Sequence, residues 1–174
     1  MGLGGWLREQ LFERRIVMLT GPLDDGAASH AAAALTALDA GGSGPIELHL
    51  DSPDGALGAA FLVIDTIGML EARVRVRCRG QVGGPAIGVL SVADRRLAGP
   101  HVRFHLAQPT ARFTGTPAEL AARSREQQDL LWRLYALVGR RCRRPAEEIA
   151  EEMRRGRYLD AAEALAYGLL DEVV

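Results

Sequence analysis

Hydrolysis by a serine needs four groups close together: a nucleophile, a base within hydrogen-bond reach, an acid that orients the base, and N–H donors for the oxyanion. The sequence offers a possible base in His105, which ends the short segment 101–105. We expect none of the serines to serve as the nucleophile of such a site, because they fall in separate predicted helices and loops. These serines are Ser29, Ser43, Ser52, Ser91 and Ser124.

The histidines and cysteines do not predict a metal site. His101 and His105 share one face of a predicted strand but lie roughly 13 Å apart along it, too far to bind one metal ion. Cys78 and Cys142 are far apart in the sequence and provide neither a disulfide framework nor a zinc site. Cys78 is predicted to be a buried apolar residue. Cys142 lies among four arginines, which could lower the pKa of its thiol, although a redox role is not the interpretation we favour.

The most informative stretch is Gly80-Gln81-Val82-Gly83-Gly84-Pro85-Ala86, which lies between an apolar strand and an apolar helix. Further landmarks are residues 14–25, 50–55, 108–109 and 158–171. In order and spacing, these segments resemble the Clp protease proteolytic subunit over nearly all of residues 11–174. In that family the turn reads Gly-Gln-Ala-Ala-Ser-Met-Gly and carries the catalytic serine.

The resemblance implies where the active-site residues of that family would fall in this chain. Gly84 stands at the position of the nucleophile, His105 at that of the base and Gly156 at that of the acid. The oxyanion donors would be two backbone N–H groups. The first is that of Gly55, which is retained, and the second would come from Pro85, which has none. His105 is therefore expected to be a remnant base only.

Two further features bear on this site. The family continues His-Gln-Pro, whereas Leu106 and Ala107 are inserted here before Gln108. Asp160 lies close to the acid position and is a possible surrogate acid. However, Asp160 followed by Glu163 is typical of a helix N-cap, which is the interpretation we favour.

The apolar patterns predict one α/β domain without a linker. Alternation of strands and helices indicates parallel crossover units, which are almost always right-handed. The resemblance implies repeated β-β-α units of the ClpP/crotonase-like fold, with a protruding handle helix at about 117–138. Residues 1–10 are expected to form a short N-terminal segment and residues 11–174 the domain. The predicted strands are 15–20, 46–50, 73–79 and 101–105, and the predicted helices are 26–40, 59–70, 85–97, 117–138, 145–154 and 161–167.

Composition and charge limit the partners. A net charge of −1 gives no electrostatic argument for nucleic acid or an anionic membrane. No apolar run approaches the roughly 18 residues that a membrane span needs. Residues 1–10 lack the pattern of a signal peptide, so a cytoplasmic location is expected. One strand face is predicted to be all arginine and either solvated or in contact with a neighbouring subunit; its residues are Arg73, Arg75, Arg77 and Arg79.

The resemblance also implies partners. Clp proteolytic subunits form heptameric rings, two of which join through the handle helices into a tetradecamer, and they work with an AAA+ unfoldase that uses ATP. We expect no cofactor or metal in this chain itself. An alternative for residues 117–138 is an ordinary amphipathic packing helix.

Three functions follow from these observations. The leading hypothesis is a noncatalytic, pseudoprotease subunit with a structural or regulatory place in a ring. The first alternative is an active Clp-type serine peptidase with a rearranged site. The second is an acyl-CoA-binding protein of the related crotonase-like superfamily, which Pro85 disfavours because that chemistry also needs two N–H donors.

Overall fold

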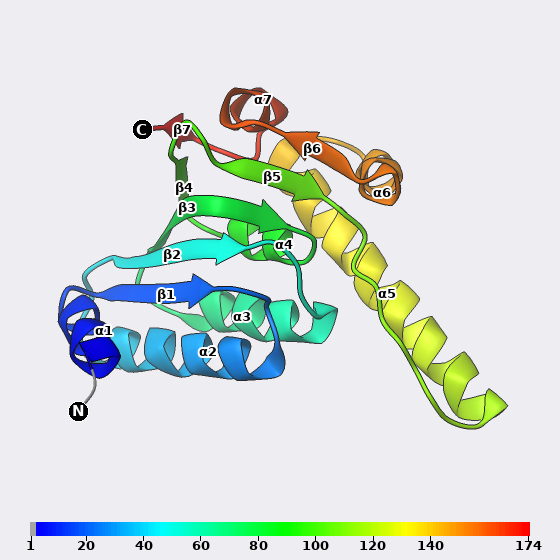
Figure 1. Ribbon diagram of the computed structural model, residues 1–174, viewed down its shortest axis with the longest axis horizontal. Helices are drawn as coiled ribbons and strands as arrows, with labels where there is room; N and C mark the ends of the chain where they lie inside the picture. The colour runs from blue at the N-terminus through cyan, green and yellow to red at the C-terminus, as the bar shows by residue number, and fades with distance from the viewer. Residues whose placement is uncertain (1–2) are drawn as a thin grey trace.

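The computed structural model describes residues 3–174; of the predicted N-terminal segment, Met1 and Gly2 lie outside the described residues. A sheet runs through the middle of the molecule in the order β1-β2-β3-β4-β7, with β5 paired to β3 and β6 paired to β5 (Figure 1). Neighbouring strands are parallel, except that β5 and β6 are antiparallel. The strands are β1 (Ile16–Thr20), β2 (Ile46–Ser52), β3 (Val74–Gly83), β4 (Arg95–Ala98), β5 (Arg103–Leu106), β6 (Arg157–Leu159) and β7 (Glu172–Val173).

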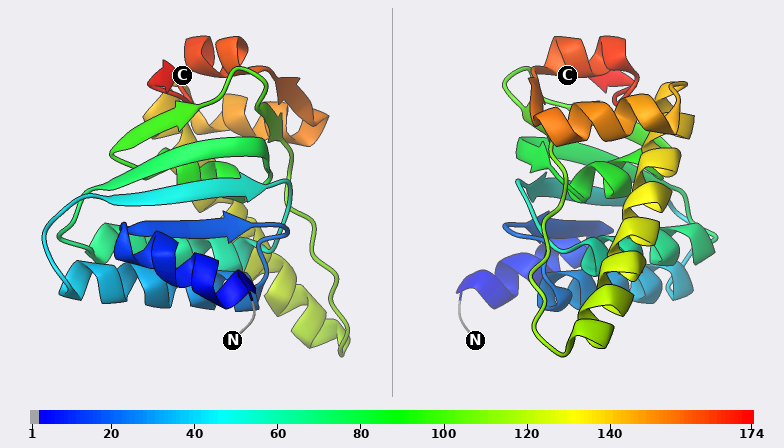
Figure 2. Two further views of the ribbon diagram at one scale, coloured as in Figure 1. Left: turned by 60° about the vertical axis from the view of Figure 1, so that its left-hand side comes forward. Right: turned by 90° about the vertical axis from the view of Figure 1, so that its right-hand side faces the viewer.

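Three helices cover one face of this sheet: α2 (Asp25–Ala40), α3 (Leu57–Met69) and α4 (Ala86–Ser91) (Figure 2). The strands direct alternate residues toward these helices, as predicted for β3, where Val74, Val76 and Cys78 are buried. The first helix, α1 (Leu3–Glu13), lies beside β1. Among the described residues, no helix covers the opposite face of β2, β3 and β4 (Figure 1). That face is therefore open.

The longest helix, α5 (Pro117–Cys142), begins with a capping box, as the spacing of Thr116 and Glu119 in the sequence predicts: the Thr116 hydroxyl accepts a hydrogen bond from the Glu119 N–H. Its first half projects away from the body of the molecule (Figures 1 and 2). Its buried residues begin only at Leu131, which shows that the second half packs on the sheet domain. Two shorter helices, α6 (Ala146–Arg155) and α7 (Ala161–Tyr167), complete the chain. The predicted α/β fold is confirmed.

The helix predicted over 85–97 is wrong in its second half. α4 is only six residues long, and β4 then runs parallel to β3 from Arg95 onward. The Asp94 carboxylate accepts a hydrogen bond from the Val74 N–H at 2.8 Å, which fixes the chain at the start of β4. The apolar run looks continuous in the sequence because a fully buried short helix and a buried strand have similar compositions.

Several other elements differ from their predictions. The strand predicted over 101–105 starts and ends later, as β5, and the helix α1 occupies most of the predicted N-terminal segment, for which no helix was expected. β3 and α5 each continue four residues past their predicted ends, to Gly83 and Cys142, and β6 and β7 were not among the predicted strands. β3 therefore ends directly before Gly84.

Candidate active site

The turn after β3 lies against the end of β5. Gly83 pairs with His105 in the register of these two strands. The Gly84 N–H donates a hydrogen bond to the His105 carbonyl oxygen at 3.1 Å. Gly84 is buried and has a φ of +53°, in the left-handed region that favours glycine. The structure thus brings together two positions that the sequence assigned to one site.

The loop after β2 approaches the same turn. A Cβ atom at Gly84 would lie 3.2 Å from Asp54 Oδ1 and 3.9 Å from the Ala107 carbonyl oxygen. The same Asp54 Oδ1 accepts a hydrogen bond from the Gly55 N–H at 2.7 Å. One carboxylate oxygen therefore engages the Gly55 N–H and faces the point at which a serine side chain would begin.

This arrangement differs from the expectation for Gly55, whose N–H we expected to remain available. Asp54 stands where the resembled family has a glycine, so a side chain is present here that can bond to the next N–H. The signal was in the sequence, because aspartate side chains often accept hydrogen bonds from nearby backbone N–H groups. The position of Gly55 itself tolerates no side chain, since a Cβ atom would lie 2.5 Å from the Leu23 carbonyl oxygen.

Pro85 follows Gly84 and begins α4 in helical geometry, with φ −69° and ψ −20°. Proline is favourable at the start of a helix because the N–H it lacks would have no partner inside the helix. All six residues of α4 are buried, so this start is packed into the core. The second predicted oxyanion position consequently has no N–H to donate.

The His105 imidazole is half-buried and stacks on the Tyr158 ring, with ring centroids 3.9 Å apart and planes 6° apart. The two residues are register partners in the antiparallel pair of β5 and β6. Stacking against an aromatic ring fixes the plane of the imidazole. The hydrogen bonds found among the described residues include none from this imidazole.

Gly156 comes directly before β6, the strand that pairs with the His105 strand β5. It ends α6 with a φ of +70°, and its N–H donates to the Glu152 carbonyl oxygen at 3.1 Å. A Cβ atom at Gly156 would lie 3.5 Å from His105 Nε2. The position predicted for the acid is therefore directed at the imidazole, but it holds no carboxylate.

Asp160 caps α7. Its Oδ1 accepts a hydrogen bond from the Glu163 N–H at 2.8 Å, and Glu163 Oε2 accepts one from the Asp160 N–H at 2.8 Å. This reciprocal pair is a capping box, so the interpretation of Asp160 as a helix cap is confirmed.

The serines lie in other environments. Ser52 is buried at the end of β2 and its hydroxyl donates to the Asp54 carbonyl oxygen at 3.2 Å. Ser91 is buried at the end of α4 and donates to the Ile87 carbonyl oxygen at 2.7 Å. The others, Ser29, Ser43 and Ser124, are exposed on α2, on a loop and on α5. None of them forms a hydrogen bond with His105 within the described part of the chain.

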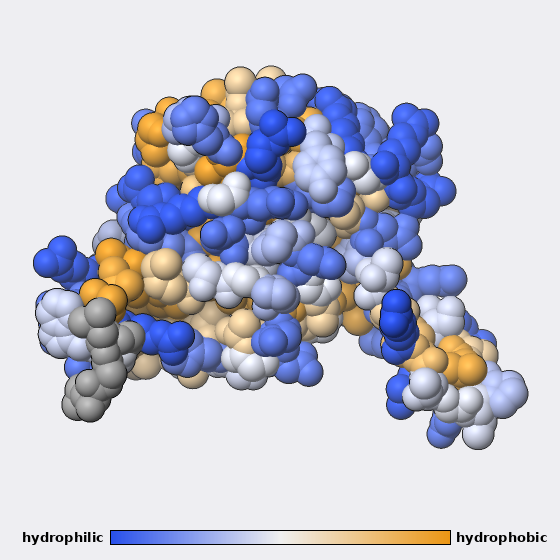
Figure 3. Space-filling model, in the orientation of Figure 1, coloured by the Kyte–Doolittle hydropathy of each residue, from blue (hydrophilic) through white to orange (hydrophobic). Residues whose placement is uncertain are grey.

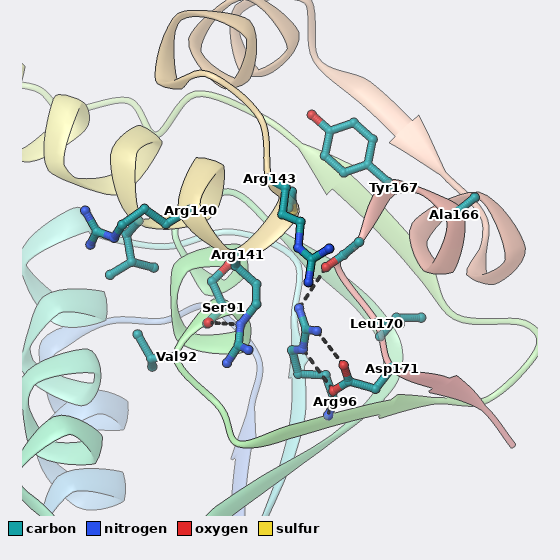
Figure 4. A pocket seen from close by; sticks show the side chains of 13 residues that line it. Ser91, Val92, Arg96, Arg140, Arg141, Arg143, Ala166, Tyr167, Leu170 and Asp171 are labelled. Atoms are coloured by element: carbon teal, nitrogen blue, oxygen red, sulfur yellow. Dashed lines mark hydrogen bonds and ion pairs between the residues drawn. The ribbon is translucent and has the colours of Figure 1, made fainter.

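A cavity of about 790 Å³ lies where the end of α5 meets α4 and the C-terminal segment (Figure 4). Arg96 is buried at its floor, where it donates to both carboxylate oxygens of Asp171 and to the Gly168 carbonyl oxygen. Arg141 donates to the Ser91 and Ala93 carbonyl oxygens. Both arginines are thus already bound within the chain: Arg96 joins β4 to the C-terminal segment, and Arg141 joins α5 to the end of α4 and the loop before β4.

Neither cysteine has the lowered pKa of a reactive thiol. Burial raises the pKa of Cys142 to about 11 in spite of the arginines around it, so the possible lowering by these arginines does not occur. Burial also raises the pKa of Cys78, which confirms its interpretation as an apolar core residue. The two thiols are free and buried.

Metal-binding clusters and membrane-spanning helices are both absent from residues 3–174. These residues contain no group of three or more His, Cys, Asp or Glu side chains placed to hold a metal ion. None of their helices is both long enough and apolar enough to cross a membrane.

A parallel sheet with crossover helices, in which a strand–turn–helix junction lies beside a strand-end histidine, is an arrangement typical of α/β hydrolytic folds. In this chain the junction lacks a nucleophilic side chain. The family model described as Clp protease matches residues 6–174. The chain therefore belongs to the Clp protease family.

Proposed function

We propose that this chain is a noncatalytic subunit of a Clp-type protease assembly, with a structural or regulatory role. The observation that carries the proposal is the set of residues around His105. The Gly84 N–H bonds to the His105 carbonyl oxygen, and a Cβ atom at Gly156 would lie 3.5 Å from His105 Nε2, so the positions expected for nucleophile and acid both lie beside this residue, and neither has a side chain. A lone base has little to act on, because the members of a catalytic triad work as a unit.

The oxyanion positions support the same proposal. Pro85 has no N–H, and the N–H of Gly55 is bonded to Asp54. Loss of one oxyanion donor typically costs about 2.7–4 kcal/mol of transition-state stabilisation. The Asp54 carboxylate adds a negative charge near the place where an oxyanion would form. The same two features disfavour acyl-thioester chemistry of the crotonase-like kind.

We further infer that the chain assembles with other Clp proteolytic subunits in rings, through α5 among other surfaces. The support is the projecting first half of α5, together with Trp132, whose side chain is 48% exposed on this helix. Exposed aromatic side chains are enriched in protein interfaces. In this proposal an AAA+ unfoldase is the partner that uses ATP, and the assembly is cytoplasmic.

Labelling with a fluorophosphonate probe tests the noncatalytic role. We expect no labelled serine in the purified chain, while an active Clp proteolytic subunit treated in parallel is labelled. Labelling that disappears in a His105→Ala variant would overturn the proposal and establish the rearranged serine peptidase.

Native mass spectrometry tests the assembly. A tagged copy of the chain purified from its own host is expected to carry other Clp proteolytic subunits in ring-sized complexes. A strictly monomeric chain, never associated with another Clp subunit, would contradict this part of the proposal. The two tests are independent, because labelling reports on chemistry and mass on assembly.

A further inference from the structure

The open face of the sheet carries an unusual row of positive charge, which we call the arginine face. It consists of Arg73, Arg75, Arg77, Arg79 and Arg95. Four of them alternate with buried residues along β3 and the residue before it, and the fifth comes from β4. Successive arginines on β3 are about 6.6 Å apart, since a strand rises about 3.3 Å per residue.

The strand register extends this row across the sheet. Arg75 is the register partner of Glu47 on β2 and of Arg95 on β4, so two arginines are direct neighbours. Neighbouring strands are about 4.8 Å apart, and like charges directly opposite each other destabilise a sheet. A side-by-side pair of arginines is better tolerated when anions lie over it.

The carboxylates on this face already form ion pairs or hydrogen bonds within the chain. Glu47 forms an ion pair with Arg77 at 3.1 Å and contacts His49. Burial would raise the pKa of the Glu47 carboxyl, but hydrogen bonds from His49 and Arg77 outweigh it and lower that pKa. Glu172 pairs with Arg95.

The third carboxylate, that of Asp51, accepts a hydrogen bond from the Gln81 N–H at 3.1 Å. Three arginines of the face remain without an ion pair among the described residues: Arg73, Arg75 and Arg79. All three are exposed. In the view of Figure 3, which looks onto this face, hydrophilic side chains gather over β3 and β4.

Unpaired guanidinium groups on a rigid strand suit carboxylates, because each presents a planar set of donors that matches a carboxylate bidentately. Two half-buried apolar residues, Met18 and Leu97, lie on the same face, in the row across the strands that contains Arg77. A mixture of arginine and apolar side chains is typical of protein interfaces. A nucleic-acid surface would be expected to interleave aromatic side chains for base stacking, and none stands on these strands.

We propose that the arginine face is a docking surface for an acidic, extended segment of a partner protein. Carboxylates on alternate residues of that segment repeat at about 6.6 Å, the spacing of the arginines on β3. Every second carboxylate of this series faces Arg75 or Arg79, which are about 13 Å apart along β3, and the carboxylate between them lies over Arg77, which is already paired with Glu47. The docking does not depend on the noncatalytic role of the chain.

A binding assay with the full chain tests this proposal. The probe is a fluorescent peptide in which glutamate alternates with threonine, and its neutral counterpart carries glutamine in place of glutamate. The Arg75→Gln/Arg79→Gln variant should bind the acidic peptide about tenfold more weakly than the wild type at low salt. The matched control is Arg140→Gln/Arg143→Gln, which removes the same charge from exposed positions at the C-terminal end of α5, away from its projecting half, and should bind as the wild type does.

Several outcomes would overturn the proposal. One is equal weakening in both variants, because net charge alone would then explain the binding. Another is equal binding of the acidic and neutral peptides, and a third is the absence of binding to the wild type at about 50 mM salt. An oligothymidylate that binds the arginine face more tightly than the acidic peptide would establish a nucleic-acid surface instead. Thermal melts of both variants check that each is folded.

Discussion

A Cβ atom on Gly156 would lie 3.5 Å from Nε2 of His105, so the backbone of this glycine still points at the imidazole that an acid would orient. A side chain at this position would therefore start next to the ring. Aspartate and asparagine tolerate the left-handed conformation that Gly156 adopts better than other side chains do. The acid position is therefore open to a direct experiment.

We expect the acid to matter only when a nucleophile is present. Gly84→Ser alone should leave fluorophosphonate labelling at background, because the base is not oriented and the oxyanion donors are missing. Adding Gly156→Asp to the Gly84→Ser variant should raise its labelling rate by at least about tenfold, through orientation of His105. The control is Gly156→Asn in the same background, which has the same shape and no charge. Equal rates in the Asp and Asn variants would contradict the geometry described here.

Asp54 is expected to suppress such restored reactivity. In the Gly84→Ser/Gly156→Asp background, Asp54→Gly frees the Gly55 N–H and removes a negative charge, so labelling should become about 100-fold faster. Asp54→Asn removes the charge but keeps an acceptor for the N–H, and we expect an intermediate rate. Comparing the Asn and Gly variants separates the effect of removing the charge from the effect of freeing the Gly55 N–H. If the proteins with Asp, Asn and Gly at position 54 were all labelled at the same rate, Asp54 would have no part in suppressing reactivity.

The backbone conformation of Gly84 should make any side chain at this position destabilise the fold, independently of its effect on reactivity. At a φ of +53°, an L-residue costs about 1–2 kcal/mol, so Gly84→Ala is expected to lower the free energy of unfolding by that amount. The control is Gly58→Ala in α3, where a Cβ atom would meet nothing within 4 Å and helix propensity favours alanine by about 0.5–1 kcal/mol. Urea denaturation measures both. Equal effects of the two substitutions would rule out strain at the turn.

The pair of Arg96 and Asp171 should make stability depend on pH. Hydrogen bonds from Arg96 hold the pKa of the Asp171 carboxyl below its usual value near 3.8. A lowered folded-state pKa stabilises the fold above the unfolded-state pKa, and this contribution is lost as the pH falls through the folded-state value. Asp171→Asn should therefore cost about 2 kcal/mol at pH 7, allowing for the partly exposed carboxylate.

The same substitution should cost much less once the pH falls below the lowered folded-state pKa of Asp171, because the wild-type carboxyl is then protonated. Urea denaturation of both proteins over this pH range measures the difference. A gap that is independent of pH, or that widens in acid, would show that Asp171 acts by shape alone.

Much of the fold was predictable from local patterns. Strict alternation of arginine with apolar residues identified β3, and the Thr116 and Asp160 capping boxes identified the starts of α5 and α7. The boundary between α4 and β4 was not predictable in this way, because it depends on pairing with β3 and on the bond from Asp94 to the Val74 N–H. Such contacts between segments far apart in sequence leave no periodic signal.

The candidate site, too, was predictable only in part. The positions of Gly84 and Gly156 came from resemblance, and the structure places both beside His105. The bond from the Gly55 N–H to Asp54 is local, and the tendency of aspartate to accept such bonds could have indicated it. That the same carboxylate faces Gly84 depends on the path of the loop after β2, which local patterns do not specify. The arginine face was visible on β3 alone, whereas the contribution of Arg95 depends on the register between β3 and β4.

Pro85 joins the turn to a helix whose every residue is buried, and this has an evolutionary consequence. Under the proposed noncatalytic role, a mutation that replaced Pro85 to regain an N–H would first weaken the start of α4 and the core around it. A serine in place of Gly84 would add strain, and neither change would help while Asp54 and Gly156 remained. Selection for stability alone would therefore keep such a chain from reverting to a peptidase.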